Sequence, residues 1–213
     1  MRLFLRRAGT LAGSYVRDAP CTYLWLTVLL LTTVAAHHMD PHSEHDFLRR
    51  RSTNLHELAT HPVRVLVSSA LWTDGGAWWP YAVLYTVFHA QAERWLSTAR
   101  WLVVVAAAHV LATLVSEGAL LWAIRYGHAP TSAVDTLDIG VSYALAGSIG
   151  VLTHRITPPW RHVYLAAALL IYGVPLATTR TFTDLGHAAA LLTGLACRPL
   201  GRGRPLPRTR PAQ

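Results

Sequence analysis

The sequence predicts an all-α membrane protein built as a bundle of six transmembrane helices, and two observations lead to this prediction. Hydrophobic residues make up 52% of the 213 residues and charged residues only 14%, a balance that suits a polytopic membrane protein better than a water-soluble one. The apolar residues also gather in six blocks separated by polar segments. A chain of this length holds about six short spans.

The six blocks predict spans at residues 22–36, 77–96, 101–124, 138–152, 162–177 and 184–197. Several are shorter than the roughly 20 residues that a helix needs to cross the hydrocarbon layer alone. Short spans are tolerated where other helices surround them or where their ends open into a wet cavity. Arg2, Arg6 and Arg7 precede the first block, as in a signal peptide, but its cleavage site is weak and more apolar blocks follow. It is therefore interpreted as a retained helix.

The basic residues predict the orientation of the chain. All 19 are arginine, and the net charge is +8. They lie between the apolar blocks and in the tails rather than on one amphipathic face, which favours a topology signal over nucleic-acid binding. With the N-terminus inside, 13 arginines fall on the inner side and six on the outer side. We therefore expect an integral, multi-pass protein of the plasma membrane with both termini in the cytoplasm.

These spans divide the chain into three parts. Residues 1–21 form a cytoplasmic segment, residues 22–197 the six-helix membrane domain, and residues 198–213 a basic cytoplasmic tail. The tail is rich in Arg and Pro and has no apolar period, so disorder is expected. The two cysteines, Cys21 and Cys197, have no zinc-site spacing, and no disulfide between them is expected.

Two polar side chains share one depth in this topology. Spans four and six both run from outside to inside, and Ser142 follows Asp138 by four residues while His187 follows Asp184 by three. At 1.5 Å per residue, each lies about one turn below the start of its helix. We expect each aspartate to cap its helix at the outer interface. Ser142 and His187 are therefore predicted to lie at matching depth.

Small residues could bring these two helices into close contact. If spans four and six pack through Gly140, Gly147, Gly186 and Ala190, the Ser142 hydroxyl would lie about 2.6–3.2 Å from His187. A serine needs a base to become a nucleophile, and His is the usual one. An ionisable side chain inside a membrane is also more often functional than not. From the residues alone, however, a serine bonded to its own helix and small residues that only pack remain the simpler interpretation.

Three motifs in order resemble the rhomboid intramembrane serine proteases. The stretch "GVSYALAGSIG" around Ser142 is similar to the rhomboid G-x-S-G of the fourth helix. The stretch "GHAAALLTG" with His187 is similar to the G-H and Gly-rich run of the sixth helix. After the second helix, "ERWLS" (Glu93 to Ser97) matches E-R-x-L-G except at its last residue. The resemblance covers roughly residues 22–197.

The resemblance implies an activity and a site. Ser142 would be the nucleophile that attacks the scissile carbonyl of a transmembrane protein substrate, and His187 would be its general base. The protein would work in the lipid bilayer without a metal or organic cofactor, and nucleic acid would not be a partner. Its class would be a serine endopeptidase, a hydrolase of rhomboid type.

The sequence departs from the rhomboid pattern in the second helix and beside the serine. Ala77 and Tyr81 occupy the positions at which the family usually has a His and an Asn that hold the oxyanion, and Tyr143 replaces the second Gly of G-x-S-G. The hydroxyl of Tyr81 or Tyr143, or backbone N–H groups near Ser142, would have to substitute. His89 is placed by its position in the inner half of span two, far from Ser142.

Two other functions remain open. A catalytically silent rhomboid-like protein that binds transmembrane helices is favoured by the missing oxyanion donors. A small transporter or metal-handling protein is suggested by the histidines of "HHMDPHSEHD" (37–46), although a solvated loop is the simpler interpretation, and "HELATH" (56–61) lacks the zinc-site spacing. In span three, we expect Glu117 to reach water at the outer end and His109 to bond a neighbouring helix.

Overall fold

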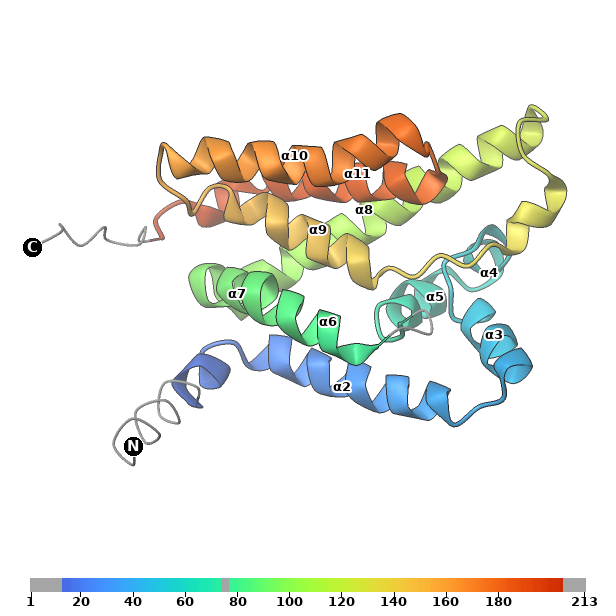
Figure 1. The fold of residues 1–213 in the computed structure, drawn as a ribbon, viewed down its shortest axis with the longest axis horizontal. Helices are drawn as coiled ribbons and strands as arrows, with labels where there is room; N and C mark the ends of the chain where they lie inside the picture. Colours follow the sequence, from blue (N-terminus) through green and yellow to red (C-terminus); the bar gives the residue numbers. More distant parts are fainter. Residues whose placement is uncertain (1–12, 74–76, 205–213) are drawn as a thin grey trace, which may run out of the picture.

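The computed structural model describes residues 13–73 and 77–204, and every regular element in these ranges is helical, as predicted. Figure 1 shows the arrangement of the longer helices. The α-helices are α2 (Pro20–His37), α3 (Pro41–Arg49), α4 (Leu55–Thr60), α5 (Pro62–Ser69), α6 (Trp78–Leu84), α7 (Ala90–Leu96), α8 (Thr98–Arg125), α9 (Val141–Leu152), α10 (Trp160–Thr178) and α11 (Phe182–Ala196). A π-helical turn, η1 (Tyr85–His89), joins α6 to α7, and two short 3₁₀ helices are η2 (Thr131–Asp135) and η3 (Arg198–Gly201).

Helices occupy the positions of all six predicted spans, but they differ in length. Within the described residues, α2, α8 and α10 are long and apolar enough to cross a membrane. The fourth and sixth predicted spans are shorter, because α9 has 12 residues and α11 has 15. The second is one helical run, α6–η1–α7, interrupted by the π turn. Three candidate spans are therefore established, and the count of six stays a prediction.

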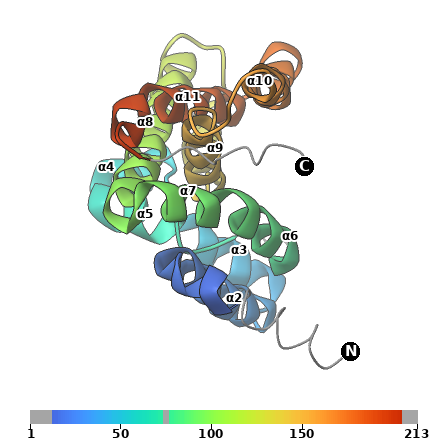
Figure 2. The same ribbon diagram turned by 90° about the vertical axis from the view of Figure 1, so that its left-hand side faces the viewer.

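The tightest packing joins α8, α9 and α11. Figure 2 shows α10 on the outer side of this group, and α2 beside the α6–α7 run at the opposite edge. In Figure 1, α9 and α11 run in the same direction, starting near the side of α3, α4 and α5. Because the two helices are parallel and adjacent, residues near their N-terminal ends lie close together. Helix α10 is loosely held, since Ala168 is its one buried residue.

Glycines allow the backbone of α9 to contact α8 and α11 directly. A Cβ atom added at Gly147 would lie 2.3 Å from the Cβ of Ala108, and one at Gly150 would lie 2.4 Å from the carbonyl oxygen of Leu191. A Cβ added at Gly194 would lie 2.1 Å from the carbonyl oxygen of Gly147. No larger side chain fits at these distances. The prediction that small residues join the fourth and sixth helices is confirmed for Gly147.

The other small residues in that prediction differ in their partners. Gly140 does not contact α11, because a Cβ there would lie 1.8 Å from the His109 ring of α8. A Cβ at Gly186 would lie 2.6 Å from the Tyr143 hydroxyl of α9, as close packing of α9 and α11 requires. Ala190 is buried in the same cluster as Tyr143. The assignment of Gly140 to the α9–α11 contact is therefore wrong.

Glu93 of the "ERWLS" motif joins α2, α7 and α8. Its carboxylate accepts hydrogen bonds from the Thr22 N–H (2.8 Å) and hydroxyl (2.7 Å), the Cys21 N–H (3.1 Å) and the Thr98 hydroxyl (2.8 Å). Two of these donors are first-turn N–H groups of α2, where a carboxylate is favoured. Ser97 has a φ of 83°, a conformation that favours glycine. This explains why the rhomboid motif ends in Gly at that position.

Most of residues 37–46 are exposed, as expected for a solvated segment, but residues 41–46 belong to helix α3 and not to a loop. Asp40 and Asn54 cap α3 and α4 through their side chains, and prolines begin α3 and α5. These are local helix-start signals that need no apolar period. In the described part of the chain, no three His, Cys, Asp or Glu side chains gather as a metal site.

The predicted domain limits are only partly covered. Residues 1–12 of the predicted N-terminal segment and residues 205–213 of the predicted tail lie outside the described residues, as do residues 74–76. The start of the tail forms η3, and Gly201 packs against Trp95. Cys21 and Cys197 are both free thiols.

The helix contacts predict a difference between two glycine substitutions. Gly194→Ala is expected to lower the free energy of unfolding by about 1–3 kcal/mol, because the new methyl overlaps the Gly147 carbonyl. Gly173→Ala in α10 is the matched control, since a Cβ there meets nothing within 4 Å. Thermal unfolding in detergent measures both, and equal destabilisation by the two variants would contradict the packing described.

Candidate active site

Ser142 and His187 meet at the start of the parallel helices α9 and α11. Ser142 is the second residue of α9, and His187 is the sixth residue of α11. The His187 Nε2 atom lies 2.9 Å from the Ser142 Oγ atom, and the pair is partly buried. The predicted contact is confirmed at a distance within the predicted range. A hydroxyl and an imidazole in this geometry can exchange a proton.

The two aspartates that were expected to cap these helices behave differently. The N-cap of α9 is Gly140 with no side-chain cap, and the Asp138 carboxylate is turned towards Tyr143, so its predicted capping role is wrong. Helix α11 has a capping box, in which the Thr181 hydroxyl accepts from the Asp184 N–H (3.1 Å) and Asp184 accepts from the Thr181 N–H (3.0 Å). The predicted role of Asp184 at the helix start is confirmed.

Asp138 forms a buried network that connects the region of Ser142 and His187 to the turn between α3 and α4. The Tyr143 hydroxyl lies 2.9 and 3.1 Å from the two carboxylate oxygens of Asp138 and 3.2 Å from the Ser116 hydroxyl. The Asp138 main chain is held by the Ser52 hydroxyl (2.6 Å) and the Thr53 N–H (3.0 Å). Burial raises the pKa of Asp138 to about 6, and hydrogen bonds from Tyr143 and Thr53 oppose part of that rise.

Aromatic rings orient the His187 imidazole. Tyr172 of α10 stacks on it at a centroid distance of 5.7 Å and an interplanar angle of 29°, and Tyr143 meets it edge-on at 5.0 Å and 69°. The main chain of Thr183, one turn earlier on α11, also interacts with the ring. No carboxylate among the described residues hydrogen-bonds the imidazole. The rings and the main chain therefore fill the orienting role that a carboxylate has in a catalytic triad.

Tyr81, Tyr143 and the backbone N–H groups near Ser142 were the groups expected to substitute for the missing oxyanion donors. The Tyr143 hydroxyl is excluded, because Asp138 engages it and the side chain is fully buried. Tyr81 packs edge-on against Tyr85 at 6.3 Å, in the same cluster as Val141. The first N–H groups of α9 have no intrahelical partner, and the N–H of Ser142 is one of them. This helix start remains as a candidate source of donors.

His89 lies away from the dyad, as predicted. Its Nδ1 atom is 3.0 Å from the Ser148 hydroxyl and 3.2 Å from the Trp101 indole N–H. Ser148 follows Ser142 by six residues on α9, nearly two helical turns. His89 therefore joins η1 to α8 and α9 and takes no part in the Ser142 site.

Two ionisable side chains in the middle of α8, Glu117 and His109, are buried. The prediction that Glu117 reaches water is wrong, because it is 1% exposed and its carboxyl oxygens have no partner among the described residues. Helix α8 continues to Arg125, so Glu117 lies two turns inside the helix end. His109 does bond a neighbour, since its Nε2 lies 2.9 Å from the Leu66 carbonyl oxygen of α5.

The fold and the site define a helical membrane protein with a Ser–His pair where two parallel helices begin. A family sequence model, described as rhomboid-like protein, matches residues 14–207. The chain therefore belongs to the rhomboid-like family. No curated protein and no solved structure matches the chain.

The burial of Asp138 predicts a pH dependence of stability. The pKa rises from 3.8 to about 6 on folding, so the folded protein binds this proton more tightly than the unfolded chain. The stabilisation is complete below pH 3.8 and is lost as the pH rises through 6, a change of about 3 kcal/mol. Unfolding measured in detergent from pH 4 to 8 should show this decline in the wild type. Asp138→Asn removes this titrating carboxyl and should make the decline shallower; identical pH profiles for the two proteins would contradict the assignment.

Proposed function

We propose that this rhomboid-like protein is an intramembrane serine protease that cleaves transmembrane protein substrates with a Ser142–His187 dyad. The observation that carries the proposal is the 2.9 Å contact between the His187 Nε2 and Ser142 Oγ atoms. Membership of the rhomboid-like family supports it, because the residues that meet are those of its G-x-S and G-H motifs.

The geometry supports a two-stage hydrolysis. His187 Nε2 takes the proton as Ser142 Oγ attacks the scissile carbonyl carbon, and the imidazolium then gives that proton to the leaving amine as the C–N bond breaks. Water next attacks the acyl-enzyme while His187 again accepts a proton, which returns to Ser142 Oγ when the ester bond breaks. The negative charge on the tetrahedral oxygen would be met by N–H groups at the start of α9.

The surroundings of the dyad suit this chemistry. Stacking by Tyr172 keeps Nε2 aimed at the serine, so the imidazole needs no carboxylate partner. Helix α10, which supplies Tyr172, is the least buried of the three candidate spans, so its displacement would cost little packing. A substrate helix could approach the dyad on this side.

The membrane arrangement is part of the same proposal. We place residues 22–197 as a six-helix domain in the plasma membrane, with both termini in the cytoplasm and the dyad near the outer surface, where water is available. The arginine asymmetry of 13 to six supports this orientation.

A second function is favoured by one observation. Ala77 and Tyr81 are at the positions where rhomboid proteases have the residues that hold the oxyanion. The Tyr143 hydroxyl donates its hydrogen bond to Asp138 and is not available for this role. Loss of an oxyanion donor costs a few kcal/mol of transition-state stabilisation. The alternative is therefore a silent rhomboid-like protein that binds transmembrane helices through the same face.

Cleavage of a transmembrane reporter by the reconstituted protein separates the two functions. Ser142→Ala and His187→Ala should each lower the rate by about a thousandfold or more, because the two side chains act as one unit. Ser148→Ala is the matched control, since Ser148 is also on α9 and also bonds a histidine, His89. It should retain cleavage.

Two outcomes would contradict the protease. One is wild-type cleavage that Ser142→Ala leaves unchanged. The other is a folded wild type that cleaves no reporter yet retains it on co-purification, and this result would establish the helix-binding alternative.

A further inference from the structure

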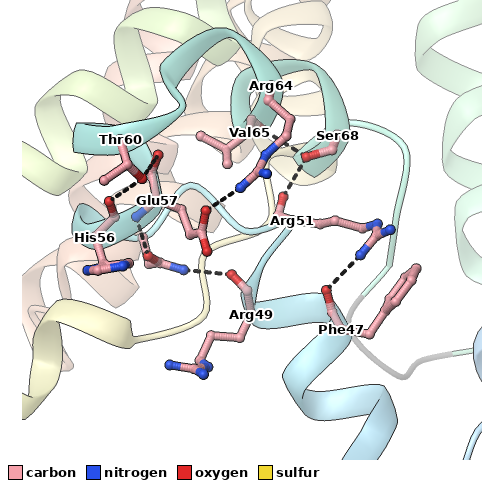
Figure 3. Close-up of polar contacts among 10 residues, drawn as sticks. Phe47, Arg49, Arg51, His56, Glu57, Thr60, Arg64, Val65 and Ser68 are labelled. Atoms are coloured by element: carbon pink, nitrogen blue, oxygen red, sulfur yellow. Dashed lines mark hydrogen bonds and ion pairs between the residues drawn. The ribbon is translucent and has the colours of Figure 1, made fainter.

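A polar pocket lies among the outer helices, apart from the Ser142 site. Its cavity volume is about 380 Å³. Its arginine, histidine and threonine side chains come from α3, the following turn, α4 and the start of α5: Arg49, Arg50, Arg64, His56, His61 and Thr60. Figure 3 shows Arg49, His56, Thr60 and Arg64 in this region. Nothing in the proposed proteolysis uses these residues.

The acidic residues of the pocket do not balance its arginines. Glu57 pairs with Arg64, and Asp135 of η2 lies 3.4 Å from Arg49. Arg50 lines the same pocket and is exposed, yet the described chain offers its guanidinium neither a hydrogen bond nor an ion pair. Asp46 also lies 3.9 Å from Arg49, so with the neighbouring Arg51 four guanidinium groups face three carboxylates, and an uncompensated positive charge remains.

The environment of the neighbouring Arg51 shows the same excess of positive charge. The guanidinium of Arg51 lies 3.3 Å from the centroid of the Phe47 ring. Burial lowers the pKa of Arg51, and the positive charges of Arg64 and Arg50 lower it further. An anion placed near Arg50 and Arg64 would relieve this repulsion.

The kind of lining indicates the kind of anion. Guanidinium groups present planar forks of N–H donors that match the oxygens of a phosphate, and charge-assisted bonds of this type are among the strongest hydrogen bonds in proteins. We propose that this pocket binds a phosphate group, carried either by a lipid headgroup or by a soluble phosphate compound.

The position of the pocket favours the lipid as the source. Val63 and Val67, one turn apart on α5, are 74% and 59% exposed, and Arg64 lies between them in the sequence. An exposed apolar pair beside an arginine suits the boundary between acyl chains and headgroups. Asp135 also ties the pocket to the segment that leads to Asp138, so an occupied pocket would brace the start of α9.

The test uses the full-length protein in detergent, with phosphatidylglycerol, diacylglycerol and inorganic phosphate as probes. Native mass spectrometry measures retained lipid, and calorimetry measures phosphate. Arg50→Gln should weaken binding by about tenfold, because it removes one charge-assisted contact. Glu57→Gln should strengthen binding, because it removes the carboxylate that competes for Arg64. Arg125→Gln, an exposed arginine at the end of α8, is the matched control and should change nothing.

The relative affinities of the variants (Glu57→Gln above wild type and Arg125→Gln, and Arg50→Gln below them) test the proposed site. The probes distinguish a lipid headgroup from a soluble phosphate compound. Retention of phosphatidylglycerol but not diacylglycerol, with that order, supports a lipid headgroup. Binding of inorganic phosphate alone, with the same order, supports a soluble phosphate compound. The proposal is overturned if neither phosphatidylglycerol nor inorganic phosphate binds. It is also overturned if Arg125→Gln weakens binding as much as Arg50→Gln, or if Glu57→Gln does not strengthen binding. Because Arg50 has no partner in the described chain, its substitution should leave the unfolding temperature unchanged.

Discussion

The direct backbone contact between α9 and α11 is the constraint on which the candidate site depends. A Cβ atom at Gly194 would lie 2.1 Å from the Gly147 carbonyl oxygen, so the two helices can approach this closely only with glycine there. The helices are parallel, and the same approach brings their first turns together. Ser142 and His187 consequently meet at 2.9 Å, although 45 residues separate them. Without this contact the serine would be an ordinary hydroxyl on an apolar helix.

A second set of interactions fixes how the pair is oriented. Tyr143 lies beside Ser142 in the sequence, fills the space left by Gly186 and touches the imidazole with its edge. Its hydroxyl is held by Asp138, whose main chain is held in turn by Ser52 and Thr53. The segment between α3 and α4 is thus connected to His187 through a continuous series of hydrogen bonds and a ring contact. These contacts hold the His187 ring in place, and the proposed role of His187 as a base requires such positioning.

The sequence was sufficient to predict the all-α fold and the dyad contact, because both follow from regular repeats. Helical rise gave Ser142 and His187 a common depth, and small residues allowed their helices to meet. The role of Asp138 could not be predicted in the same way. Capping rules are local, whereas its actual partners, Tyr143 and the Ser52–Thr53 segment, come together only through tertiary packing. Tyr143, which the sequence offered as a substitute oxyanion donor, instead packs against His187 and bonds Asp138 for the same reason.

The most direct test of the central claim is covalent labelling by a serine-directed phosphonate, read by intact mass and peptide mapping. Because a phosphonate reacts only with a serine whose base can take its proton, the label should appear once, on Ser142. Labelling should be lost in Ser142→Ala and reduced by at least about tenfold in His187→Ala. A folded wild type that takes no label, or a label on another serine such as Ser148, would contradict the dyad.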